Sequence, residues 1–155
     1  MTDIQTLTIL LGQHERQRDA AIAEHQRAQG AAEAARAQAE QLHGYRRDYE
    51  QRWSAQFCRE GKIELVRCYQ SFMERLTLAV EQQARIAAHS ALQVERALNA
   101  LRDSEMRCAS VRKLIERRLV EQRLATDRRD QKQTDEAATR AAWNRLGSTR
   151  PAPLM

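Results

Sequence analysis

The chain has 155 residues, of which 30% are charged and only 5% are aromatic, and it contains just 5 Gly and 2 Pro. Ala, Arg, Gln, Glu and Leu dominate, a composition that is typical of long helices and coiled coils and argues against a compact globular core. The net charge of +5 comes from interspersed acidic and basic residues, which favours solvated helix faces over a dedicated basic domain.

No residue pattern indicates catalysis, a cofactor or a metal. Cys58, Cys68 and Cys108 are odd in number and far apart, and the four histidines show no helical i,i+3 or i,i+4 pairing with one another. The five glycines are isolated, so no phosphate-binding loop is present. No segment reaches the roughly 18 apolar residues of a membrane span, and no secretion signal is seen. We therefore expect a cytosolic, non-enzymatic chain with free thiols.

The first helix is predicted over residues 2–58, where Thr2 and Gln5 have the spacing of a capping box. An apolar stripe at heptad spacing follows, although His14, Arg18 and His25 fall on it and its middle is rich in alanine. Alanines bury little area, so this part contributes little free energy of packing. The stripe consists of Ile4, Leu7, Leu11, Ala21, Ala28, Ala32, Ala35, Ala39, Leu42, Tyr49 and Trp53.

A turn is predicted at residues 59–61, with Gly61 as the N-cap and Glu64 at the third position of the next helix. The second helix is predicted over residues 62–146. Its apolar stripe shifts in phase by about one residue near 87–94, as in a coiled-coil stutter. The stripe consists of Leu65, Tyr69, Phe72, Leu76, Ala79, Ile86, Leu98, Leu101, Cys108, Val111, Ile115 and Leu119.

A mirrored spacing relates the two helices. Residues Gln38, Leu42, Tyr45 and Tyr49 step by 4, 3 and 4, and Phe72, Leu76, Ala79 and Gln83 repeat those steps. Positions 49 and 72, 45 and 76, 42 and 79, and 38 and 83 each sum to 121, the register of two antiparallel helices that fold about a turn at 60 and 61. The predicted fold is therefore all-α, a long antiparallel two-helix coiled-coil hairpin.

The same register leaves residues 119–146 without an intramolecular partner, because the first helix ends opposite residue 118. This overhang is either frayed or a helix that becomes ordered inside another protein. Gly147, Pro151 and Pro153 then predict a disordered tail over residues 147–155.

Two surfaces are candidates for binding. The residues at 4-3-4 spacing near the bend form either a buried seam or a seam with a binding edge. The second alternative is supported by Gln38, Tyr45 and Gln83, which fall beside the apolar stripes. Residues 107–132 carry nine basic and four acidic side chains. This run favours a solvated face, and its alternative is a basic coiled coil that binds nucleic acid or anionic membrane.

Several segments resemble the flagellar FliJ family: Tyr45-Arg46-Arg47-Asp48-Tyr49, the bend at Gly61 with Phe72 and Leu76 after it, and the run from Arg128 to Ala138. The resemblance covers nearly the whole chain. It implies a hairpin similar to the central stalk of rotary ATPases. It also implies a cytoplasmic component of the flagellar type III export apparatus, peripherally associated with the inner membrane at the basal body. An injectisome-type secretion stalk is the alternative within this class.

The partners that the resemblance implies are the hexameric export ATPase, the cytoplasmic domain of the export-gate protein FlhA, and export chaperones, with no specific nucleic acid. It assigns the gate-binding patch to Gln38, Leu42, Tyr45, Tyr49, Phe72, Leu76, Ala79 and Gln83. Gln83 replaces the His of the best-known pattern and cannot become charged near neutral pH. The ATPase ring would be bound by the helix ends, through Ile4, Leu7, Leu11, Arg112, Ile115, Leu119 and Arg123.

Overall fold

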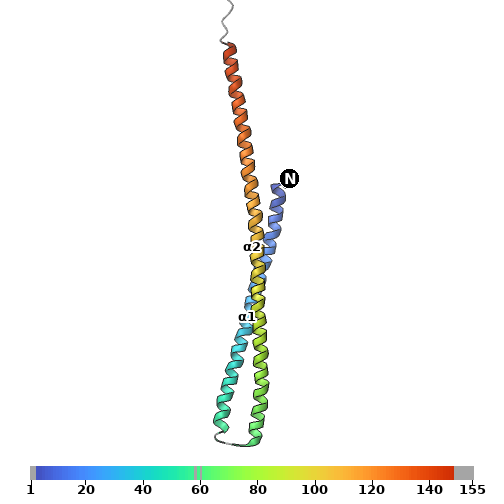
Figure 1. Cartoon of the computed structure of the whole chain (residues 1–155), viewed down its shortest axis with the longest axis vertical. Helices are drawn as coiled ribbons and strands as arrows, with labels where there is room; N and C mark the ends of the chain where they lie inside the picture. The colour runs from blue at the N-terminus through green and yellow to red at the C-terminus, as the bar shows by residue number, and fades with distance from the viewer. Residues whose placement is uncertain (1–2, 58, 60, 149–155) are drawn as a thin grey trace, which may run out of the picture. The chain divides into compact units, whose positions relative to one another are not determined.

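A computed structural model describes residues 3–57, 59 and 61–148 and contains two α-helices (Figure 1). Helix α1 spans Ile4–Phe57 and helix α2 spans Ile63–Ser148. No strand occurs in these described ranges. The two helices pack against each other, so the predicted all-α hairpin is confirmed.

The helix ends differ in detail from the sequence prediction. The amide of Leu7 donates to the carbonyl of Asp3 at 3.1 Å, and the predicted cap at Thr2 lies outside the described residues. At the second helix the amide of Val66 donates to the carbonyl of Lys62 at 3.3 Å, so Lys62 is the N-cap and the prediction of Gly61 was wrong. Gly61 has no positive φ, and a Cβ built on it would meet nothing within 4 Å.

Helix α2 also continues past Leu146 through Gly147 to Ser148, whose hydroxyl donates to the carbonyl of Arg145 at 3.0 Å. A glycine in a helix costs only about 1 kcal/mol relative to alanine, which is not enough to end a helix by itself. The rest of the predicted tail, residues 149–155, lies outside the described residues.

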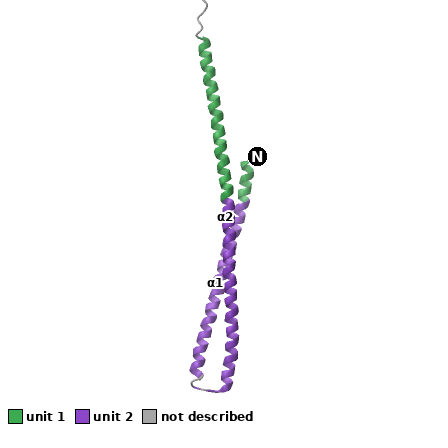
Figure 2. Ribbon diagram, viewed as in Figure 1, with its two compact units in different colours: residues 1–12, 109–155 green, residues 13–108 purple. Residues whose placement is uncertain are grey.

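The chain divides into two compact units (Figure 2). Residues 13–108 form one, which we call the hairpin unit because it contains the bend. Residues 1–12 and 109–155 form the other, which we call the terminal unit.

Within the hairpin unit, buried and half-buried residues form one continuous heptad stripe on each helix. On α1 the stripe is His14, Arg18, Ala21, His25, Ala28, Ala32, Ala35, Ala39, Leu42, Arg46, Tyr49 and Trp53. On α2 it is Tyr69, Met73, Leu76, Val80, Gln83, Ala87, Ser90, Val94, Ala97, Leu101, Ser104 and Cys108. Both stripes alternate steps of three and four residues, as knobs-into-holes packing requires. We refer to the two stripes together as the seam.

The predicted phase shift near residues 87–94 is therefore wrong. Phe72 and Ile86, assigned to the seam from their apolar character, are 40% and 46% exposed. The seam instead uses Gln83 and Ser90, polar residues that an apolar pattern passes over. When seam residues of the two helices are paired in order from the bend, the residue numbers of each pair sum to 122. The predicted pairs sum to 121, so the seam is offset from the predicted register by one residue.

In the terminal unit, Leu7 and Val111 are buried at 5% and 6% exposure, and Ile4, Leu11, Ile115 and Arg118 are half-buried. These positions continue the same three-and-four spacing. Every residue from Leu119 to Ser148 is exposed. At 1.5 Å per residue this segment is a helix of roughly 45 Å.

Candidate protein-binding surface near the bend

The eight patch residues predicted from the sequence lie in the hairpin unit and divide into two groups. Leu42, Tyr49, Leu76, Ala79 and Gln83 are half-buried. Gln38, Tyr45 and Phe72 are exposed, the last two at 49% and 40%. The patch is thus neither wholly core nor wholly surface.

Heptad position explains this division. Gln38 and Tyr45 each directly precede a seam residue of α1, and Phe72 and Ala79 each directly precede a seam residue of α2. In an antiparallel pair, the positions that precede the seam on both helices flank the same side of it. We call this side, comprising Gln38, Tyr45, Phe72 and Ala79, the patch edge.

Aromatic rings join the two helices close to the bend. The ring centroids of Tyr49 and Phe72 lie 4.9 Å apart with the planes tilted by 56°. Trp53 and Tyr69 make a second such pair at 5.4 Å and 40°. Tilted pairs of this kind contribute about 0.5–1.5 kcal/mol beyond their buried area. Phe72 therefore contacts Tyr49 on one side, and 40% of its surface is exposed.

Gln83 connects the helices by polar contacts. Its Nε2 donates to the carbonyl oxygen of Ala35 at 3.2 Å and to Oε1 of Gln38 at 3.1 Å. Ala35 is buried at 6% exposure, so Gln83 reaches into the seam. A carbonyl only accepts hydrogen bonds, which fixes the NH₂ group of Gln83 toward α1. The prediction that Gln83 lies beside the seam was therefore wrong.

The exposed patch residues retain hydrogen-bonding capacity. The hydroxyl of Tyr45 accepts from Nε2 of Gln41 at 3.4 Å and still has its own proton to donate. Oε1 of Gln38 accepts from Gln83. Arg46, the seam residue next to Tyr45, pairs with Glu50 at 3.5 Å. The patch edge therefore combines amide and hydroxyl groups with aromatic side chains, which are enriched at protein interfaces.

The opposite side of the seam is a shallow open groove rather than a pocket. It is lined by Arg46, Tyr69, Gln70, Met73, Glu74, Thr77 and Leu78. Gln70 and Thr77 directly follow seam residues, which places this groove on the side away from the patch edge.

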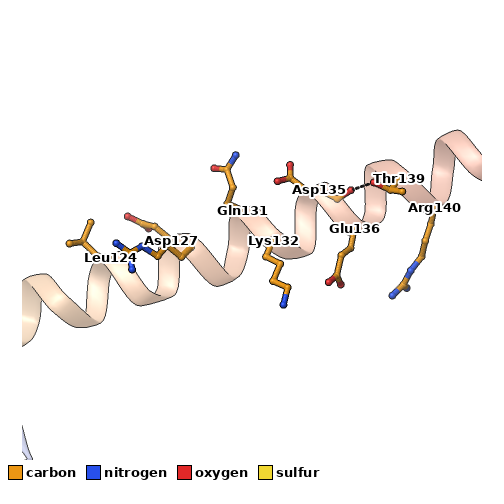
Figure 3. Close-up of a pocket in the computed structure, with 9 residues that line it drawn as sticks. Leu124, Asp127, Gln131, Lys132, Asp135, Glu136, Thr139 and Arg140 are labelled. Atoms are coloured by element: carbon orange, nitrogen blue, oxygen red, sulfur yellow. Dashed lines mark hydrogen bonds between the residues drawn. The ribbon is translucent and has the colours of Figure 1, made fainter.

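A second surface hollow lies on α2 in the terminal unit, and all its residues belong to one exposed helix (Figure 3). It extends from Leu124 to Arg140. The dashed contact in Figure 3 is the hydroxyl of Thr139 donating to the carbonyl of Asp135 at 2.8 Å, a bond within the helix. Since one helix supplies every lining residue, this is a helix face and not an enclosed site.

The residues predicted for ATPase binding also divide by burial. In the terminal unit, Leu7 is buried and Ile4, Leu11 and Ile115 are half-buried. Arg112, Leu119 and Arg123 are exposed. The residues of the second group are therefore the most accessible to a partner.

Across the described part of the chain, no group of three or more His, Cys, Asp or Glu residues is arranged to hold a metal ion. Neither helix has a stretch that is long and apolar enough to cross a membrane over the ranges that were described.

Sequence reasoning missed Arg46, which occupies the seam between Leu42 and Tyr49. The sequence does indicate this position, because Arg46 follows Leu42 by four residues and precedes Tyr49 by three, as a heptad stripe requires.

A family model described as "Flagellar FliJ protein" matches residues 4–147. Neither the curated proteins nor the solved structures gave a match.

Proposed function

The chain belongs to the flagellar FliJ family, and we propose that it couples the hexameric export ATPase to the membrane export gate of the flagellar type III apparatus. Family membership supports a role in flagellar protein export. The finer assignment, to the ATPase, to the cytoplasmic domain of FlhA and to export chaperones, is our proposal. In it the protein acts without catalysis, in the cytoplasm, at the inner-membrane base of the flagellum.

The observation that carries the gate assignment is the patch edge. Tyr45 and Phe72 are large aromatic side chains at 49% and 40% exposure on one side of a two-helix coil. Tyr45 accepts a hydrogen bond from Gln41 one turn earlier on the same helix, and the ring of Phe72 contacts that of Tyr49. Rigid, half-exposed aromatic residues are frequent hot spots of protein interfaces, because they bury much area for little loss of side-chain entropy.

The ATPase assignment rests on the terminal unit. Residues 119–148 form an exposed helix with Leu119, Val120 and Leu124 at 50–57% exposure near its start. A helix with no tertiary packing gains little stability from its own sequence, so a partner that buries its apolar side chains would stabilise it. Arg112 and Arg123 add exposed charges for a partner with acidic groups.

The gate assignment is tested by titrating the purified cytoplasmic domain of FlhA with the full chain and with Tyr45→Ala. We expect Tyr45→Ala to weaken binding roughly tenfold, the effect of a loss of about 1.4 kcal/mol. Leu78→Ala is the control, since Leu78 is 64% exposed and lies outside the patch edge. Equal binding by Tyr45→Ala and the unmodified chain would contradict the assignment, provided circular dichroism shows equal helicity.

A further inference from the structure

The patch edge does not end at Ala79. Phe72, Ala79 and Ile86 are spaced by seven residues, so each directly precedes a seam residue and all three lie on the same side of α2. Ile86 is 46% exposed. An aliphatic side chain in line with Phe72 therefore continues the surface for one further heptad.

The sequence of α1 explains why Ile86 is uncovered. In the seam register Ala87 and Ser90 lie opposite Ala35 and Ala32. On the same side of α1, the residue nearest to Ile86 in this register is Gln38, which is itself exposed and whose Oε1 accepts from Gln83. Ile86 therefore stays 46% exposed, and its aliphatic surface is open to a partner.

A polar pair separates the aromatic and aliphatic parts of this edge. The NH₂ group of Gln83 is used twice, by the Ala35 carbonyl and by Oε1 of Gln38. Since its oxygen accepts from Gln83, the exposed Gln38 offers its own NH₂ group as a donor. The hydroxyl of Tyr45 is a second donor on this edge.

We propose that the gate-binding surface extends past Gln83 to Ile86, and that its partner presents a hydrogen-bond acceptor to Gln38 between two apolar contacts, one at Phe72 and one at Ile86. This inference rests on the proposed function and deepens it. The acceptor is a carbonyl or carboxylate oxygen, because the NH₂ group that Gln38 offers there can only donate.

The extension to Ile86 is tested with a matched pair of truncations, Ile86→Ala and Leu92→Ala. Both remove an aliphatic side chain of similar exposure, 46% and 44%, from the same helix. Leu92 lies two residues after Ser90 and faces away from the seam. In titrations with the cytoplasmic domain of FlhA, we expect Ile86→Ala to raise the dissociation constant about tenfold and Leu92→Ala to leave it unchanged.

The acceptor is tested with Gln38→Glu. The carboxylate still accepts the hydrogen bond from Gln83, so the contact between the helices is kept while the exposed donor becomes an acceptor. We expect the dissociation constant to rise at least tenfold, because two acceptors would then face each other. Equal binding would overturn the contact at Gln38, and tighter binding would show that the partner presents a donor there.

Failure of the extension and failure of the proposed function give different results. If Tyr45→Ala weakens binding but Ile86→Ala behaves like Leu92→Ala, the surface ends before Ile86 and the gate assignment stands. If the unmodified chain does not bind the domain, both the extension and the gate assignment are wrong.

Discussion

Polar side chains occur in the seam of the hairpin unit where they form a hydrogen bond or reach solvent. Arg18 lies on the seam, yet its side chain is 26% exposed and donates two hydrogen bonds to Asp19 at 3.0 and 3.2 Å. The hydrogen bond to the Asp19 carboxylate raises the pKa of Arg18 above its usual value. His14 differs, because its Nδ1 is buried without a hydrogen-bond partner in the described structure.

Replacing His14 with leucine should stabilise the protein. His14→Leu removes a buried nitrogen that has no hydrogen-bond partner and adds apolar area to the seam, so we expect the free energy of unfolding to rise by about 1–3 kcal/mol. Urea denaturation followed by circular dichroism measures the change. His43→Leu is the control, since His43 is exposed and should change stability little. A less stable His14→Leu variant would mean that the imidazole makes a stabilising contact.

The orientation of the individual patch residues could be predicted only in part from the sequence. Gln38 and Tyr45 were placed beside the seam because apolar residues at heptad spacing surround them, and both are exposed. Gln83 was misplaced because the predicted stripe runs through Leu76, Ala79 and Ile86, which leaves position 83 beside it. Its burial depends on two hydrogen bonds across the helices, and no single-residue property encodes them.

At the scale of the helices, the glycines of α1 are tolerated rather than required. A Cβ built on Gly30 or Gly44 would meet nothing within 4 Å, and neither residue has a positive φ. Close backbone approach therefore does not explain them. They lower the stability of a helix whose alanine-rich seam already contributes little packing energy.

Each of Gly30→Ala and Gly44→Ala should raise the stability of the chain. Alanine is favoured over glycine in a helix by about 1 kcal/mol, and there is space for the methyl group at both positions. Thermal unfolding followed by circular dichroism should give a higher midpoint for each variant, and the exposed Ala31→Gly should lower it. A lower midpoint for Gly30→Ala would indicate a contact that needs glycine.

The amides in the exposed segment of α2 should be less protected against hydrogen exchange than those of the other helical segments. Amides of residues 121–148 lie in a helix whose side chains are all exposed, whereas residues 69–108 pack along the seam. Local opening costs less free energy where no tertiary contacts break. Hydrogen exchange followed by mass spectrometry should show faster exchange in 121–148. Equal protection of the two segments would contradict this expectation.

The helices and the mirrored spacing could be predicted from the sequence, but the phase of the second stripe could not. Tyr49 and Phe72, paired by the mirrored arithmetic, are in ring contact. The apolar pattern nevertheless chose Phe72 and Ile86 for the seam of α2. The seam in the structure passes through Met73, Gln83 and Ser90. A strict heptad count along α2 selects all three, although Gln83 and Ser90 are polar.

At the scale of the whole molecule, the two proposed binding regions belong to different units. The patch edge lies in the hairpin unit, and the exposed helix of residues 119–148 lies in the terminal unit. No residue is shared between them. We therefore expect the gate and the ATPase to bind through separate residues, which is what a coupling protein requires.

The most direct test of this account is whether one chain binds both partners at once. We would mix the full chain with the hexameric export ATPase and the cytoplasmic domain of FlhA and measure the masses present by analytical ultracentrifugation. We expect a ternary complex that is lost on truncation after Arg118 and weakened by Tyr45→Ala. Mutually exclusive binding, in which the gate domain displaces the ATPase from the chain, would contradict it.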